Sequence, residues 1–175
     1  KPVNLLKATS KLSLQSLKRH IREWHEDAAN AHFGEKAIYS YPHLKPFTHQ
    51  LGLSQFTLLT QNIELYREGR IMHHCVYVSY ANSVKAGNYV VFQVERENER
   101  ATLGIIVAQR DPLNLIYQQC FSYCNGNISP EMRQDVDAFM THINSQPKDW
   151  INLSLVNNEV CIDDMIDEEE YMLHG

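Results

Sequence analysis

Long hydrophobic runs are missing from this sequence. No apolar stretch approaches the roughly 18 residues that a membrane-spanning helix needs, and the first residues, KPVNLLKATSK, lack the apolar core of a signal peptide. These absences predict a cytoplasmic protein with no membrane partner. The sequence also lacks an initial Met, from which we expect it to be a piece of a longer chain.

A surplus of positive charge is missing too. The 16 Lys and Arg residues face 21 Asp and Glu residues, which gives a formal net charge of −5. Proteins that bind DNA through its phosphates usually carry a basic stripe, so this balance does not favour a nucleic-acid partner, although Lys18, Arg19 and Arg22 leave a local basic face open. Protein partners are the better expectation. The acidic excess collects in DDMIDEEEY, which is more typical of a solvated terminal run than of a docking tail.

Cysteine is sparse, and its spacing does not match a metal site. The four residues are Cys75, Cys120, Cys124 and Cys161. Without a secretory signal we expect reduced thiols instead of disulfides. Three residues separate the cysteines of CFSYC, where zinc ribbons have two, and adjacent histidines rarely bind one ion with both rings. The sequence therefore predicts no metal and no cofactor.

Length and composition are those of one globular domain, with 175 residues of which 43% are hydrophobic and 21% charged. Three segments, NYVVFQVE, ATLGIIVA and LIYQQCF, are rich in β-branched and aromatic residues and are joined by short links. They predict an α+β fold in which an antiparallel β-meander of three or more strands packs with flanking helices. The sequence contains no repeat and no low-complexity segment.

Four segments have the apolar spacing or the end signals of helices. These are SLQSLKRHIREWHEDAANAHFG, TQNIELYREG, a helix that begins near His74 and continues through CVYVSYANSVKAG, and SPEMRQDVDAFMTHIN. We expect Thr60 to cap the second, Gly69 to end it, and Ser129 to cap the fourth. The chain then divides into an N-terminal helical segment with a proline-containing connector (1–46), an α+β core (47–146), and a C-terminal extension with an acidic tail (147–175), which adds a strand or packs on the core.

Cys75 and His74 are the candidate catalytic residues. A cysteine in the first turn of a helix faces the positive end of the helix dipole, which favours the nucleophilic thiolate. His74 is the nearest base, but neighbours on a helix point about 100° apart, so it is a poor partner unless it precedes the helix. The alternative, which the spacing alone favours, is a small thiol packed in the core beside Met72 and Val76.

Gln119 and Asn125 are candidate ligand-binding residues. Alternation along a strand groups Leu115, Tyr117, Gln119 and Phe121 on one face, so the Gln119 amide would need a hydrogen-bond partner such as His74 or Asn125. The alternative for CNGN is a plain turn.

Several of these residues fall in sequence blocks that resemble the PcfJ-like protein family, which is named from a conjugative plasmid. The blocks contain Leu65, Glu68, Gly69, Met72, His73, His74, Cys75 and Val76, then Ala101, Thr102 and Leu103, then Gln119, Ser122 and Asn125. Tyr80 falls one residue late, and Ser122 replaces a glycine. The resemblance covers about residues 38–140, including most of the α+β core. It implies a bacterial protein of a plasmid or mobile element, and it adds His73 and Thr102 to the candidate ligand-binding residues.

Two functions fit these observations. One is a non-enzymatic accessory domain of a plasmid, conjugation or mobile-element system, in which the polar cluster of His, Cys, Gln and Asn fixes a helix on the sheet. The other is a cysteine-dependent enzyme or a domain that processes a nucleotide or another small ligand, with Cys75 as nucleophile and His74 as acid or base. The first is favoured because no complete set of nucleophile, base and orienting residue has suitable spacing.

Overall fold

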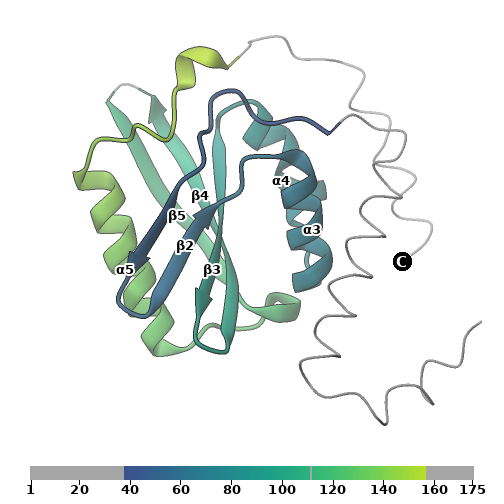
Figure 1. The fold of residues 1–175 in the computed structure, drawn as a ribbon, viewed down its shortest axis with the longest axis vertical. Helices are drawn as coiled ribbons and strands as arrows, with labels where there is room; N and C mark the ends of the chain where they lie inside the picture. Colours follow the sequence, from purple (N-terminus) through teal and green to yellow (C-terminus); the bar gives the residue numbers. More distant parts are fainter. Residues whose placement is uncertain (1–37, 111, 157–175) are drawn as a thin grey trace, which may run out of the picture. The chain divides into compact units, whose positions relative to one another are not determined.

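The sheet forms where β-branched and aromatic residues are densest. The computed structural model describes residues 38–110 and 112–156, which contain a five-stranded antiparallel sheet in the order β1-β2-β3-β4-β5 (Figure 1). Its strands are β1 (Thr48–Leu51), β2 (Ser54–Leu58), β3 (Tyr89–Arg96), β4 (Glu99–Arg110) and β5 (Leu113–Phe121). Each strand pairs with the next one in the chain, so the predicted meander is confirmed.

The hairpin of β1 and β2 is absent from the sequence-based prediction. Both strands are short and carry polar residues between the apolar ones, which weakens their β signal. Gly52 forms the turn with φ +59°, a left-handed conformation that glycine adopts without steric cost. Tertiary packing stabilises the hairpin, because Phe56 of β2 is fully buried and its ring stacks on that of Phe139.

Three α-helices among the described residues cover the two faces of the sheet (Figure 1). Helices α3 (Asn62–Met72) and α4 (Val76–Lys85) lie on one face and α5 (Pro130–Ser145) on the other. Under α5, the rings of Phe56 and Phe139 stack with centroids 4.0 Å apart, and Phe92 meets Phe139 edge-on at 5.2 Å. Burial of each such ring contributes about 1.5–3 kcal/mol. The sheet and its helices confirm the α+β class.

The helix ends differ in part from the prediction. Helix α3 continues through Gly69 to Met72, so the expectation that Gly69 ends it is wrong, and its N-cap is Gln61 instead of Thr60. The Glu64 carboxylate accepts the backbone N–H groups of Thr60 and Gln61 at 2.7 and 3.0 Å, which moves the start by one residue. At α5 the prediction is confirmed: the Ser129 hydroxyl accepts the N–H of Met132 at 3.1 Å.

Residues 147–156 pack on the core. Trp150 and Ile151 are buried, and Ile151 forms a β-bridge with Leu44 before the short helix η3 (Leu153–Leu155). The described residues from Tyr39 onward belong to one compact unit; the boundaries at 46 and 146 stay predictions. The helix predicted near the N-terminus and the acidic tail lie outside the described residues. No helix in the described part of the chain is long and apolar enough to cross a membrane.

Candidate functional site

The turn between α3 and α4 is built around Gly69. The backbone N–H groups of His73 and His74 both donate to the Gly69 carbonyl, the second at 3.1 Å. His73 is left-handed, with φ +53°, which is the usual conformation where a helix ends. A Cβ on residue 69 would lie 2.9 Å from the His74 carbonyl oxygen. Glycine at 69 therefore lets the chain fold back closely over the end of α3.

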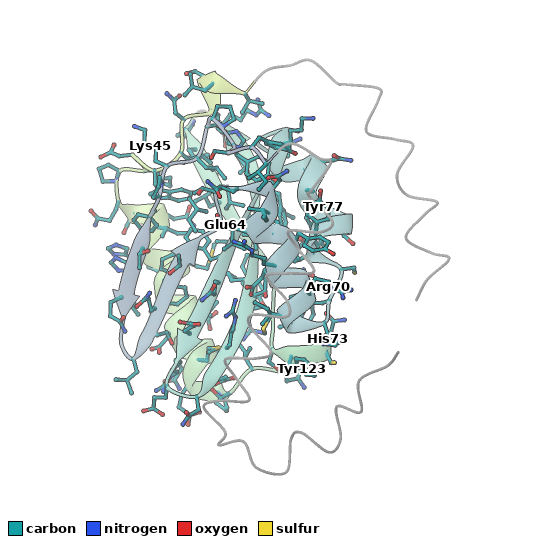
Figure 2. All side chains as sticks on the ribbon, turned by 45° about the vertical axis from the view of Figure 1, so that its right-hand side comes forward. Lys45, Glu64, Arg70, His73, Tyr77 and Tyr123 are labelled. Atoms are coloured by element: carbon teal, nitrogen blue, oxygen red, sulfur yellow. The ribbon has the colours of Figure 1, made fainter. Side chains whose placement is uncertain are left out.

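Beside this turn lies a second tight turn, the short helix η2 (Tyr123–Asn125) at the end of β5. Figure 2 shows His73 next to Tyr123, and their ring centroids are 4.8 Å apart. Cys124 and Asn125 are both left-handed, with φ +54° and +57°. A left-handed residue other than glycine costs roughly 1–3 kcal/mol and is often found at functional sites. We call His73, Tyr123, Cys124 and Asn125, which are all exposed, the junction surface.

Ser122 resolves one departure from the family blocks. It occupies the position of a glycine, but its backbone is extended, with φ −79° and ψ −173°. Its N–H donates to the Gly126 carbonyl at 2.9 Å and its hydroxyl to the Asn127 carbonyl at 3.0 Å. Serine thus fits this position, and it supports the turn with a side-chain hydrogen bond.

The two candidate catalytic residues have different surroundings. Cys75 is the N-cap residue of α4, one position after the predicted helix start, and it is exposed. His74 is half-buried, and its Nε2 atom has no hydrogen-bond partner among the described residues. Burial lowers the pKa of the His74 imidazole, so the ring is neutral at neutral pH. The described residues contain no cluster of three or more His, Cys, Asp or Glu that could hold a metal ion.

Thr102 lies in a buried polar group that we call the Glu68 cluster. Its hydroxyl donates to Glu68 Oε1 at 2.6 Å, and the guanidinium of Arg100 pairs with the other carboxylate oxygen. Arg100 also donates to Gln93 Oε1 at 3.0 Å. The Glu68 side chain is 1% exposed and that of Arg100 28%. Both carboxylate oxygens are therefore engaged inside the protein, as a buried charge requires.

The sequence-based site did not include Glu68, Arg100 or Gln93. Glu68 does carry a readable signal, because it lies between Leu65 and Met72 on the buried face of α3. A carboxylate on an apolar helix face needs a cation or donors nearby. The identity of those partners depends on the register of β3 and β4, where Gln93 pairs with Thr102.

Gln119 belongs to a third group, beside α4. The Tyr80 hydroxyl donates to its side-chain oxygen at 3.4 Å, and the Tyr80 ring stacks on Tyr89 with centroids 4.5 Å apart. Gln119 thus meets Tyr80, where the sequence suggested His74 or Asn125. Tyr89 in turn lies over Gly104, where a Cβ would be 1.9 Å from its hydroxyl.

The expected frame that groups Tyr117 with Gln119 is wrong. The pairing of β4 with β5 shifts between Gly104 and Ile105, which leaves Gln118 as an extra residue. Such a bulge interrupts the alternation of side chains along a strand. The Tyr117 ring accordingly contacts the Arg133 guanidinium of α5, 4.9 Å from its centroid, while Gln119 contacts α4 on the opposite face.

The six candidate residues therefore separate into three places: the two neighbouring turns (His73, His74, Cys75 and Asn125), the Glu68 cluster (Thr102) and the Tyr80 contact (Gln119). No hydrogen bond among the described residues joins His74 or Cys75 to Gln119 or Asn125. Their roles in binding or catalysis remain predictions.

Comparison with known proteins supports the family resemblance that the sequence blocks indicate. A family model described as "PcfJ-like protein" matches residues 7–137, which is more than half of the chain. Comparisons with curated proteins and with solved structures gave no match.

Proposed function

Since this chain belongs to the PcfJ-like protein family, we propose that it is a non-enzymatic accessory domain of a bacterial plasmid, conjugation or other mobile-element system. It works in the cytoplasm and binds a protein partner through the junction surface. The mobile-element setting is what the resemblance to the family implies. The binding mode is argued from the geometry of the site.

The Glu68 cluster is the observation that carries the proposal. Thr102 and Arg100 each bind one oxygen of the buried Glu68 carboxylate, so these polar residues hold α3 on the sheet. A nucleophilic cysteine also needs a base within hydrogen-bond reach. Cys75 is exposed, whereas the Nε2 atom of His74 is buried and unpaired. This arrangement supports a structural role for Glu68, Thr102 and His74, the buried or half-buried residues of the family blocks.

The junction surface has the features of a binding site. The Tyr123 side chain is 56% exposed although it is large and apolar, and aromatic residues often contribute most of the energy at protein interfaces. Three left-handed residues, His73, Cys124 and Asn125, hold two turns side by side. The net charge of −5 disfavours a phosphate backbone as the partner. These observations support a protein partner.

The proposal is tested by replacing exposed side chains one at a time, at the junction surface, at Cys75 and at a control position. The gene is deleted from the element that carries it and restored as wild type, Tyr123→Ala, Cys75→Ala or Leu53→Ala, and the transfer frequency of the element is measured. Leu53 is the matched control, since it is 57% exposed and lies in the turn between β1 and β2. Circular dichroism confirms that each variant is folded.

We expect Tyr123→Ala to reduce transfer at least about tenfold, since loss of an interface aromatic costs roughly 1–4 kcal/mol of binding. Cys75→Ala and Leu53→Ala should transfer like wild type. If folded Cys75→Ala abolishes transfer, the protein uses the thiol, and the non-enzymatic proposal is wrong. If Tyr123→Ala transfers normally, the junction surface is not the binding site.

A further inference from the structure

Two histidines outside the family blocks stack on each other. His49 lies in β1, at one edge of the sheet, and His142 lies in the last turn of α5. Their imidazole centroids are 4.2 Å apart and the ring planes are inclined by 19°. Both side chains are half-buried. The pair joins an edge strand to the helix that covers the sheet.

The rings packed around this pair are uncharged. His49 stacks on Phe47 with centroids 6.2 Å apart and lies 6.0 Å from Phe139. The residue opposite His49 on the neighbouring strand β2 is Phe56. Partial burial removes water that would solvate a charged imidazole, which favours the neutral ring.

Charged groups on the neighbouring elements do not neutralise the pair. On α5, Asp135 is engaged with Ser54 at 2.7 Å and with Arg96 at 3.3 Å. Lys148, just after α5, donates to the carbonyls of Asn144 and Gln146. The other charged residues on α5 are Glu131, Arg133 and Asp137, and Lys45 and Asp149 lie just outside β1 and α5. Neither imidazole forms an ion pair with any of them within the part of the chain that the structure describes.

We propose that the His49–His142 pair is a pH-sensitive contact, which holds β1 on α5 when the rings are neutral and releases it when both are protonated. Two positive charges at this separation repel each other, and the repulsion is strong where water is partly excluded. A second proton therefore binds readily only after the rings move apart. Burial and the neighbouring His142 both lower the pKa of His49, which agrees with this coupling.

The release is local because the other end of the hairpin has a separate anchor. The Ser54 hydroxyl and the Arg96 guanidinium bind Asp135 of α5, about two helical turns before His142. Release of β1 would uncover the backbone edge of β2, and an uncovered edge can pair with another strand.

Hydrogen exchange on the full chain tests the proposal. Peptides that cover β1 are compared at pH 7.5 and pH 5.5 with peptides from β3 and β4, after correction for the intrinsic pH dependence of exchange. In wild type we expect protection of β1 to fall below about pH 6.5, by about tenfold per pH unit for each proton taken up, while β3 and β4 stay protected. His49→Phe keeps an aromatic ring on Phe47 without a titrating group, so β1 should then stay protected at both pH values. His142→Gln should likewise remove the pH dependence.

Two results would overturn the proposal. One is a pH-dependent loss of protection in β1 that persists in His49→Phe and in His142→Gln. The other is an equal loss in β3 and β4, which would show global unfolding. Imidazole NMR signals give an independent check: His49 should take up its proton at a lower pH in wild type than in His142→Gln, and equal midpoints in the two proteins would contradict the coupling.

Discussion

At the scale of single residues, the family blocks combine two kinds of polar residue. Glu68 and Thr102 are buried and bind each other across α3 and β4. His73 and Asn125 are exposed and hold left-handed backbone. The sequence alone cannot separate these two kinds, because both are polar residues within the same sequence blocks. Burial separates them, since a buried carboxylate must keep its donors whereas an exposed turn is solvated.

Thr102→Val should lower the free energy of unfolding by about 1–3 kcal/mol. Valine has nearly the shape of threonine, but it leaves Glu68 Oε1 without its donor at a buried site. Urea unfolding of the full chain measures the change. Thr57→Val in β2 is the matched control, since Thr57 is only half-buried, and it should change stability by less than about 0.5 kcal/mol. Equal effects of the two substitutions would show that the hydroxyl of Thr102 does not stabilise the Glu68 cluster.

At the scale of elements, the end of a helix is predicted correctly where several local signals agree. It is predicted incorrectly where a residue such as Gly69 has another structural reason. Ser129, Pro130 and Glu131 define the start of α5 because cap, ring and charge all favour the same residue. Gly69 resembles a helix stop, but a close approach of the His74 carbonyl explains the glycine. The strands of the β1–β2 hairpin are short and carry polar residues, so their sequence gives little indication of β structure. Their burial depends on contact with α5.

Ser129→Ala should destabilise the protein by about 0.5–2 kcal/mol, because α5 loses its cap. The Ser129 hydroxyl also donates to Glu99 Oε2 at 2.5 Å, so the start of β4 loses a contact as well. Thermal unfolding measures the change. Ser145→Ala is the control: its hydroxyl donates to the His142 carbonyl at the exposed end of the same helix. A loss as large in Ser145→Ala as in Ser129→Ala would contradict the capping argument.

At the scale of the whole molecule, three histidines in the described part of the chain couple stability to pH. Burial is the main cause of a lowered pKa at His43, His49 and His74. A histidine whose pKa is lower in the folded chain binds a proton more tightly when unfolded. Its stabilising contribution is therefore complete above the unfolded pKa of about 6.5 and decreases as the pH falls toward the folded value.

We accordingly expect the free energy of unfolding to be level between pH 7 and 8 and to decrease steadily from pH 6.5 to 5.5. Urea unfolding at these pH values measures it. His43 is 1% exposed and burial lowers its pKa, so His43→Leu should reduce the slope below pH 6.5. A slope that is unchanged in His43→Leu, or a protein that becomes more stable on acidification, would contradict this assignment.

Features that depend on neighbours along the chain could be predicted from the residues alone. The sequence predicted β3, β4 and β5 from runs of β-branched and aromatic residues, α5 from its end residues, and the family from its blocks. Contacts between distant side chains follow from tertiary packing instead. Thr102 finds Glu68 34 residues away, and His49 finds His142 across the edge of the sheet. These contacts depend on strand register, on one bulge beside Gln118 and on how the helices lie over the sheet, and none of these is encoded by local spacing.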